Sequence, residues 1–260
     1  MYGSKMNDSQ TIIEVKNLKA GYNGIEVLKD INFSVYKGEI FVIIGCSGSG
    51  KSTLLKHMIG LYSPISGDIL IKGESIVNAR DEEKKRIMRN FGVLYQSGAL
   101  FNSYTIGENV ALPLEEFTEF SANEIANIVK EKLSLVGLEG CERLMPYECS
   151  GGMKKRAGLA RAMALNPEIL FFDEPSAGLD PIMSAKLDRL ILNIRAELNT
   201  TMVIVTHELD SIYAIADRVM MIGGEEKTVI AVGKPFELRE SQNKTVREFF
   251  TRDGLISKIH

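Results

Sequence analysis

The chain has 260 residues, of which 45% are hydrophobic and 25% are charged, so its composition excludes a disordered or fibrous protein. Its 31 basic residues stand against 34 acidic ones, and the net charge of −3 gives no bulk attraction to nucleic acid or to an anionic membrane. The longest apolar runs, such as residues 41–44 and 169–172, fall far short of the roughly 20 residues that span a bilayer. We therefore expect no membrane-spanning helix and no nucleic-acid partner.

The start of the chain and its cysteines favour a cytoplasmic location. Residues 1–10, MYGSKMNDSQ, contain no apolar core, so we expect no signal peptide. The three cysteines, Cys46, Cys141 and Cys149, are odd in number and form no CxxC pair. This spacing suggests neither a disulfide framework nor a zinc site.

Short runs rich in β-branched and aromatic residues recur along the chain and predict strands. Several of them are continuously apolar rather than alternating, as is typical of strands that are buried on both faces of a parallel sheet. The predicted strands are residues 11–15, 39–45, 68–73, 91–96, 168–174, 201–207 and 228–233.

The stretch from about residue 98 to residue 165 has little strand signal and a helical pattern instead. Ser121 and Glu124 form a capping box, apolar residues follow at helical spacing, and Gly137 is placed to end that helix. Alternation of strands and helices returns after this stretch. We expect an α/β domain over residues 1–240, interrupted by a helical subdomain at about 98–165.

Residues 241–260 predict a C-terminal helical tail. Val246, Phe249 and Phe250 recur at helical spacing and would form a narrow apolar stripe. The tail has four basic and two acidic residues, and a net charge of +2 is too small for stable membrane attachment without a second anchor. We expect the stripe to dock on a neighbouring protein subunit.

The strongest local signal is GCSGSGKS at residues 45–52, which fits G-x-x-x-x-G-K-[ST] and lies between a predicted strand and a helical run. Glycines let backbone N–H groups converge on phosphate oxygens, and the helix start adds its positive dipole end. Lys51 would supply charge to the β- and γ-phosphates, and Ser52 a hydroxyl ligand to Mg²⁺. The expected nucleotide-binding residues here are Gly45, Cys46, Ser47, Gly48, Ser49, Gly50, Lys51, Ser52 and Thr53.

Two carboxylates follow the apolar run at residues 169–172. Asp173 and Glu174 would lie at the C-terminal end of a strand, which is where ligands bind in open α/β sheets. Beside a phosphate-binding loop, Asp173 would hold Mg²⁺ through water and Glu174 would act as the general base on the attacking water. A pair of acidic residues that merely ends a strand is the simpler alternative.

A second helix start able to hold an anion follows at Ser150, Gly151 and Gly152, because an apolar-periodic helix comes directly after them. A chain with one nucleotide site does not need two helix starts that bind the same phosphate. We therefore expect these residues to contact the γ-phosphate bound to a partner subunit, although a helix-capping serine is the default interpretation of this run alone.

In this order the motifs resemble the ATP-binding-cassette (ABC) ATPases, over nearly the whole chain from about Ile13 to Gly233. The resemblance implies a P-loop NTPase fold of the ABC ATPase type, with a RecA-like α/β core, an antiparallel β subdomain and a helical insertion. It also implies ATP and Mg²⁺ as cofactors and ATP hydrolysis coupled to transport. The implied assembly is a homodimer of ATPase subunits on an integral-membrane permease, at the cytoplasmic face of the inner membrane.

The resemblance implies a role for four further residues. Tyr22 would stack on adenine, with an edge-strand tyrosine as the simpler alternative, and Gln96 would contact Mg²⁺ and sense the transporter. Asp180 would couple the two sites across the dimer, and His207 would contact the γ-phosphate. The implied catalytic residues are Glu174, His207 and Lys51, and the implied metal ligands are Ser52, Gln96 and Asp173.

The signature run at residues 149–153 departs from the usual L-S-G-G-Q, because Cys149 replaces Leu and Met153 replaces Gln. Met153 cannot make the amide hydrogen bonds of Gln. The form S-G-G-M-x-K-R, with the run at residues 95–114 and the tail sequence VREFF, resembles the ATPase of Mce-associated phospholipid transporters, which maintain outer-membrane lipid asymmetry. This resemblance implies an Mce-type lipid-binding protein and a small accessory subunit as further partners.

We expect residues 97–114 to lie between the active site and the permease and to form the contact with the permease. Leu100, Phe101 and Leu112 are candidates for a groove that receives a permease helix, although packing within the insertion is the simpler explanation for any one of them.

Other functions remain open on these residues. An amino-acid type or other small-solute importer is the alternative within the family, and a non-transport cassette of DNA repair or ribosomes is the alternative outside it. The single cassette without zinc-ligand spacing or a long heptad run disfavours the latter. A subunit with an inactive site is disfavoured because all the chemical groups are present, and a GTPase because no N-K-x-D run occurs.

Overall fold

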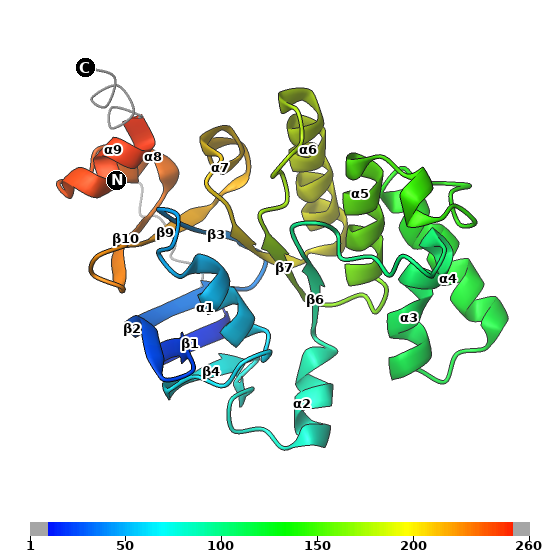
Figure 1. The fold of residues 1–260 in the computed structure, drawn as a ribbon, viewed down its shortest axis with the longest axis horizontal. Coiled ribbons are helices and arrows are strands. Elements are labelled where there is room, and N and C mark those ends of the chain that lie inside the picture. Colours follow the sequence, from blue (N-terminus) through cyan, green and yellow to red (C-terminus); the bar gives the residue numbers. More distant parts are fainter. Residues whose placement is uncertain (1–9, 252–260) are drawn as a thin grey trace, which may run out of the picture.

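Two β-sheets with helices around them form the frame of residues 10–251, the part of the chain that the computed structural model describes (Figure 1). Residues 1–9 of the expected domain and residues 252–260 of the expected tail lie outside this part.

The larger sheet has six strands in the order β10-β9-β3-β8-β7-β6. Neighbours from β9 to β6 are parallel, and β10 pairs antiparallel with β9 at one edge. The carboxyl ends of the parallel strands therefore meet along one edge of the sheet. The strands are β3 (Ile40–Gly45), β6 (Phe91–Leu94), β7 (Ile169–Asp173), β8 (Thr201–Val205), β9 (Arg218–Ile222) and β10 (Val229–Gly233).

The smaller sheet is antiparallel, with the order β2-β1-β4-β5. Its two long strands are joined by Asn23 and Gly24, both at positive φ, which is the backbone of the two-residue turns that suit the twist of a hairpin. The strands are β1 (Thr11–Tyr22), β2 (Ile25–Tyr36), β4 (Ser66–Ile71) and β5 (Glu74–Ser75).

Three of the helices, α3 to α5, lie between β6 and β7 in the chain and gather on one side of the molecule (Figure 1). The capping box at Ser121 and Glu124 is confirmed, and the helix after it ends at Leu135, just before Gly137. The helices are α1 (Lys51–Met58), α2 (Asp81–Met88), α3 (Ile106–Phe117), α4 (Ala122–Leu135), α5 (Gly151–Ala162), α6 (Pro181–Leu198), α7 (Leu209–Ile215), α8 (Pro235–Arg239) and α9 (Lys244–Thr251), with a 3₁₀ turn at Pro146–Glu148.

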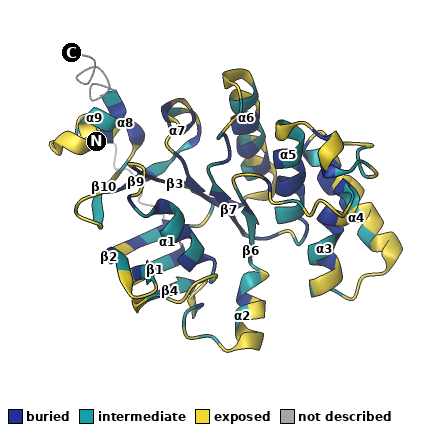
Figure 2. Cartoon of the chain, viewed as in Figure 1, coloured by how far each residue is buried: buried dark blue, intermediate teal, exposed yellow. Residues whose placement is uncertain are grey.

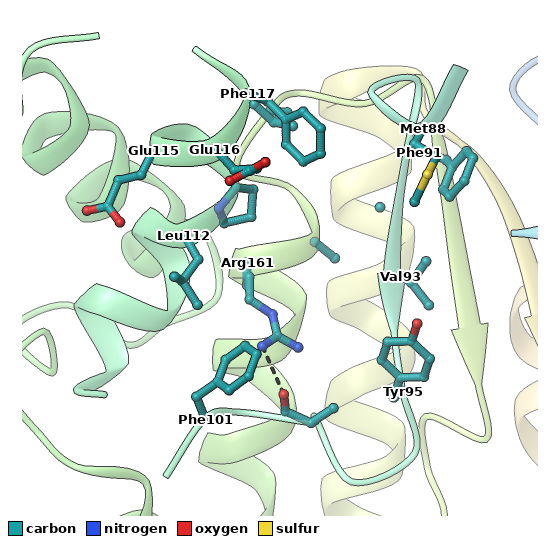
Figure 3. Close-up of a pocket in the computed structure, with 15 residues that line it drawn as sticks. Met88, Phe91, Val93, Tyr95, Phe101, Leu112, Glu115, Glu116, Phe117 and Arg161 are labelled. Carbon is teal, nitrogen blue, oxygen red and sulfur yellow. Dashed lines mark hydrogen bonds between the residues drawn. The ribbon is translucent and has the colours of Figure 1, made fainter. Parts of the chain in front are cut away.

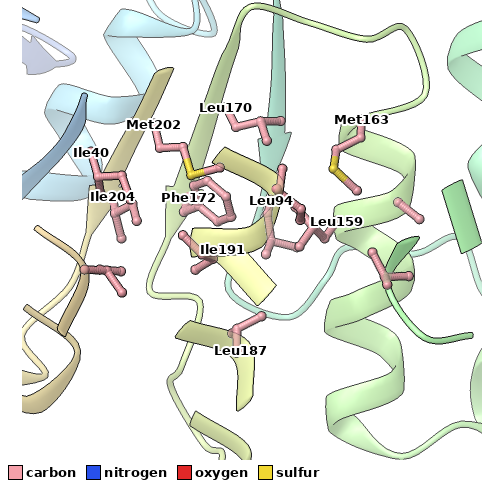
Figure 4. Close-up of a cluster of buried hydrophobic side chains, with 14 of the residues drawn as sticks. Ile40, Leu94, Leu159, Met163, Leu170, Phe172, Leu187, Ile191, Met202 and Ile204 are labelled. Carbon is pink, nitrogen blue, oxygen red and sulfur yellow. The ribbon is translucent and has the colours of Figure 1, made fainter. Parts of the chain in front are cut away.

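The inner strands β3, β7, β8 and β9 of the six-stranded sheet are buried on both faces, which explains their continuously apolar sequences (Figure 2). Successive side chains of a strand point to opposite faces. In β3, Ile40, Val42 and Ile44 pack toward the helices α3 to α7, in the cluster that Figure 4 shows. Phe41 and Ile43 pack toward α1 and the antiparallel sheet. The sheet therefore stands between two apolar cores, and its loops at the carboxyl edge rest on a rigid base.

The tail helix α9 packs on its own chain. Val246 and Phe250 are buried in the same core as α7 and α8, and the hydroxyl of Tyr213 donates to the backbone oxygen of Phe250 over 3.3 Å. The prediction that a neighbouring subunit covers these two residues is therefore wrong, because α7 and α8 already supply the apolar surface that they need. Within residues 10–251, none of the helices is both long and apolar enough to span a membrane.

Candidate nucleotide site

The phosphate-binding loop connects the end of β3 with the first turn of α1. Gly45 has φ 153°, and a Cβ there would lie 2.5 Å from Oγ of Ser49 and 2.6 Å from the backbone oxygen of Ile222. Only glycine fits this point, which is where the chain leaves the sheet. Gly50, at φ 98°, is the N-cap of α1. The geometry thus turns the strand sharply into a helix, as the motif requires.

Lys51 folds back over this loop. It is 9% exposed, and its ammonium donates to the backbone oxygens of Gly45 over 2.8 Å and of Cys46 over 3.0 Å. Burial lowers the pKa of Lys51 below its usual range, while the negative charges of Glu174 and Asp173 act in the opposite direction. The two hydrogen bonds hold the lysine ammonium at the loop. A bound phosphate could replace the two carbonyls as its partner.

The rest of the loop fits an anion. Cys46, Ser47 and Gly48 are exposed, and the first turn of α1, from Lys51 to Thr53, contains no acidic residue that would oppose a phosphate. The hydroxyl of Ser49 is buried in the loop and has no hydrogen-bond partner within residues 10–251. Such an orphaned hydroxyl indicates unused capacity for a phosphate oxygen.

Ser52 and Asp173 come together across the carboxyl edge of the sheet. The hydroxyl of Ser52 donates to Oδ1 of Asp173 over 3.1 Å, which joins the first turn of α1 to the end of β7. Mg²⁺ in nucleotide sites is typically held by one or two protein oxygens together with phosphate oxygens and waters. This hydroxyl–carboxylate pair is a donor set of that kind, so it fits the ion.

Glu174 sits on a strained turn directly after β7. Its φ of 49° costs a residue with a side chain about 1–3 kcal/mol. The amide of Glu174 donates to the backbone oxygen of Val205 over 2.9 Å, which anchors the turn to β8. The carboxylate lies 3.0 Å from Nδ1 of His207, whose side chain is 57% exposed. A carboxylate and an imidazole are therefore held as a pair at the carboxyl edge.

Gln96 and Tyr22 flank this site in different ways. Gln96 is exposed and lies two residues beyond the end of β6, whose Leu94 pairs with Phe172, so it emerges at the same edge as Asp173 and Glu174. Tyr22 ends β1, and its ring packs edge-on against Tyr62 with centroids 4.8 Å apart. β1 is an inner strand of its sheet, so Tyr22 is not the edge-strand tyrosine of the simpler alternative.

Ser150 and Asp180 lie at helix starts. Oγ of Ser150 accepts from the amide of Met153 over 3.2 Å and caps α5, with Gly151 and Gly152 in its first turn. Asp180 caps α6 through the amides of Ile182 and Met183, each over 3.0 Å. Figure 1 places α5 on the other side of β7 from α1, so one chain does not bring the signature residues to its own loop.

Two contacts escaped the sequence reasoning. Lys155 is buried and donates to backbone oxygens just after Glu174, and helical periodicity with the buried Gly158 and Leu159 could have placed it on the inner face of α5. Tyr62 meets Tyr22 only through the fold, and no local pattern marks it.

The family model described as ABC transporter matches residues 28–177, more than half of the chain. The chain belongs to the ABC transporter ATPase family. Among solved structures, the ATP-binding cassette MJ0796, a dimer in a post-hydrolysis state bound to ADP and phosphate, is 30% identical with a TM-score of 0.77, covering 85% of this chain and 98% of that one. The cassette CbiO1 of Clostridium perfringens is 28% identical with a TM-score of 0.80, covering 96% and 98%.

Two groups of curated relatives resemble this ABC ATPase. The MlaF protein of Haemophilus influenzae, named for intermembrane phospholipid transport, is 41% identical over 93% of this chain and 90% of its own length. The Mkl protein of Mycobacterium leprae, named for ribonucleotide transport, is 43% identical over 91% of this chain but 68% of its own length. For Mkl of Mycobacterium tuberculosis the identity is 42% and that share 66%. The chain thus spans about two thirds of the Mkl proteins.

As a family member the chain is an ABC ATPase: it binds ATP and hydrolyses it as the ATPase subunit of a transporter. Its fold is the one that the resemblance implied, since the solved cassettes match nearly their full length.

Proposed function

We propose that this ABC ATPase drives phospholipid transport between the inner and outer membrane through a membrane permease. The observation that carries the proposal is the match to MlaF, which extends over 93% of this chain and 90% of the relative. Transport of a ribonucleotide is the second candidate, because an Mkl protein reaches a similar identity, 43% against 41%. That match leaves about a third of Mkl without a counterpart, so we favour the phospholipid.

In the proposed reaction, the loop at residues 45–53 holds the phosphates of ATP while Tyr22 stacks on adenine. Ser52, Gln96 and Asp173 would hold Mg²⁺, which neutralises charge on the phosphates when bound. Glu174 accepts the proton of the attacking water, and the pairing with His207 at 3.0 Å holds its carboxylate in place. The imidazole would also contact the γ-phosphate.

The proposed active form is a head-to-tail homodimer with two shared sites. Ser150, Gly151 and Gly152 begin α5 on the far side of β7 from the loop that Lys51 folds over. A phosphate in that loop would meet a signature helix only from a second copy. Asp180, exposed at the start of α6, would lie between the two sites and couple them.

A groove lined by Tyr95, the residue before Gln96, supports the contact with a permease. It has a volume of about 850 Å³ and is walled by β6, α3 and α5. Figure 3 shows Phe101, Leu112 and Phe117 among the residues that line it. The guanidinium of Arg161, which also lines the groove, donates to the backbone oxygen of Ala99. Phe101 is 54% exposed, a large apolar residue that a partner would cover.

Two details of the groove change the set of residues expected to receive a permease helix. Leu100 does not line it, since its side chain packs against the hydrophobic core instead. Glu115 and Glu116 do line it, and Figure 3 shows both carboxylates on the α3 side. The proposed occupant is a permease helix with an apolar face and a basic residue opposite this pair.

The proposed assembly further includes an Mce-type lipid-binding protein and a small accessory subunit, as the signature run at residues 149–153 and the MlaF relatives suggest. The proposed location is the cytoplasmic face of the inner membrane, where the permease would hold the subunit.

The test is purification of the tagged chain from its native membranes, with mass spectrometry of the proteins and lipids that accompany it. We expect a permease and bound phospholipid, and an ATPase rate that changes when phospholipid is added to the complex. Recovery with a nucleotide-binding partner protein and a rate that responds to ribonucleotides other than the hydrolysed ATP would favour the second candidate. An amino-acid permease and indifference to phospholipid would contradict both.

A further inference from the structure

Lys155 is a buried cation in the middle of α5. It is 6% exposed, and its ammonium donates to the backbone oxygen of Pro175 over 2.6 Å and to that of Ala177 over 2.5 Å. Burial lowers its pKa, and the negative charge of Glu174 acts in the opposite direction. A buried cation needs partners to offset its lost hydration, and these two carbonyls supply them.

The two carbonyls belong to the segment that carries Glu174. Glu174 adopts φ 49°, and strained backbone of this kind persists only where its surroundings hold it. On one side the amide of Glu174 is anchored to Val205 of β8. On the other side, Lys155 of α5 holds the segment through the carbonyls of Pro175 and Ala177. The conformation of the expected catalytic base is therefore tied to the signature helix.

The helix that carries Lys155 is held along its length. Gly158 lies so close to the loop after β6 that a Cβ there would stand 2.8 Å from the backbone oxygen of Gly98. Arg161 donates to the backbone oxygens of Gly98 and Ala99 over 3.0 and 2.9 Å. Ser150 begins the same helix five residues before Lys155, a rise of about 7–8 Å. A shift of the helix start would therefore reach Lys155 as a movement of one rigid element.

We propose that Lys155 is a positioning residue that transmits closure of Ser150–Gly152 over the partner's nucleotide to Glu174 of its own chain. The inference rests on the shared sites of the proposed function. Each signature helix would then report the occupancy of one site to the base of the other. Lys155 touches neither ATP nor water in this role, and it acts through the backbone at Pro175 and Ala177.

The test replaces Lys155 by methionine in the full chain, since methionine keeps the apolar stem and loses the donors. Nucleotide-binding sites are first titrated with a fluorescent ATP analogue, so that turnover is expressed per competent site and unfolded protein does not count. We expect turnover per site to fall at least about tenfold, because small displacements of a catalytic group are costly. The affinity for the analogue should stay within about threefold, and the Hill coefficient for ATP should fall toward about 1.

Arg156→Met is the matched control. Arg156 is the next residue of α5 and also donates to two backbone oxygens, those of Val136 and Gly137, but these lie just after the end of α4. The Arg156→Met substitution therefore removes the same kind of hydrogen bond from the same helix, and it leaves the contacts of the segment after Glu174 unchanged. We expect its turnover per site to stay within about threefold of the parent.

Lys155→Arg keeps donors for both carbonyls and should recover at least about a third of the parent turnover per site. The arginine variant also tests the proposal if Lys155→Met yields no sites that bind the ATP analogue. If Lys155→Arg then loses its competent sites to the same extent, the proposal is overturned. Parent turnover and Hill coefficient in Lys155→Met would overturn it as well. If Lys155→Met hydrolyses ATP slowly but the two copies of a dimer do not share their nucleotide sites, the proposed homodimer is contradicted. The proposed transmission between sites is then contradicted as well.

Discussion

At the scale of single residues, Glu174 has the geometry of a general base that is held rather than free. Its carboxylate is 3.0 Å from the imidazole of His207, and its backbone is fixed to β8. Glu174→Gln keeps the shape of the side chain but cannot accept the proton of water. We expect turnover to fall roughly 10²–10⁴-fold while ATP still binds. Steady-state hydrolysis and equilibrium binding of a fluorescent ATP analogue measure the two effects separately.

Lys51→Ala is the matched comparison for that variant. Removing this cation takes away the charge that the loop offers to phosphate, so nucleotide affinity should fall before chemistry is reached. Near-parent hydrolysis in Glu174→Gln would exclude Glu174 as the base.

Cys46 is an exposed thiol within the phosphate-binding loop. Alkylation there would place a bulky group where the phosphates are expected to lie. We expect N-ethylmaleimide to abolish ATP hydrolysis and prior addition of ATP to protect against it. Cys149 is buried, and burial raises its pKa, so its thiolate is scarce and it should react slowly. Cys46→Ser should remain active after treatment, and its inactivation at the parent rate would assign the effect to another cysteine.

At the scale of elements, the packing of α7 on α6 contains a buried carboxyl. Asp188 of α6 is 9% exposed and accepts from the hydroxyl of Ser211 of α7 over 2.9 Å. Burial raises the pKa of Asp188, and the bond from Ser211 lowers it to a smaller extent. Asp188 thus binds its proton more tightly in the folded chain, so stability is lost as pH rises from the ordinary aspartate pKa through the raised one.

Asp188→Asn keeps an acceptor for Ser211 and removes this pH-dependent loss. We expect it to raise the free energy of unfolding more at about pH 8, well above the ordinary aspartate pKa, than near about pH 4. Urea unfolding followed by circular dichroism at both pH values measures the difference. Equal stability changes at the two values would mean that ionisation of Asp188 does not contribute.

Strands that are buried on both faces and rich in branched or aromatic residues were predictable, because their signal is local. The runs at residues 169–173 and 201–205 are strands as expected. β2 was missed, since polar residues interrupt it on its solvent face, although the Asn23-Gly24 turn before it is a strong hairpin signal. β9 was missed as well: its run RVMMI has methionines in place of branched residues, and only the pairing with β3 shows its role.

The residues of the candidate site likewise fall into those that the sequence predicts and those that only the fold brings together. The loop at residues 45–53 and the pair Asp173 and Glu174 are contiguous in sequence, so their pattern indicates them directly. The clasp by Lys155 and the ring contact of Tyr22 with Tyr62 join segments far apart in the chain. Such contacts depend on the packing of whole elements, which a single sequence does not specify.

At the scale of the whole molecule, the phosphate-binding loop and the signature helix α5 stand apart in one chain. Each is half of a site if the proposed homodimer is the active form. The loop of one copy then works with Ser150–Gly152 of the other, and ATP lies between them as the main source of attraction. Copies without ATP should therefore dimerise weakly.

A mixed dimer decides whether the sites are shared. One copy carries Lys51→Ala and the other Ser150→Arg, with different affinity tags so that only mixed dimers are collected. If the sites are shared, both changes fall in one site, and the second site combines an intact loop with an intact signature. If each chain used its own signature, neither site would be intact. We therefore expect mixed dimers to trap about one ATP per dimer when Glu174→Gln is added to both copies.

The two matched dimers complete the comparison. Dimers in which both copies carry Lys51→Ala, or both carry Ser150→Arg, damage both sites under either arrangement and should trap almost no ATP. The expected contrast is thus one ATP in the mixed dimer against none in the matched ones. Because an unshared site loses either its own loop or its own signature in every mixed dimer, a mixed dimer that traps no more ATP than the matched dimers would show that this ATPase does not share its sites between copies.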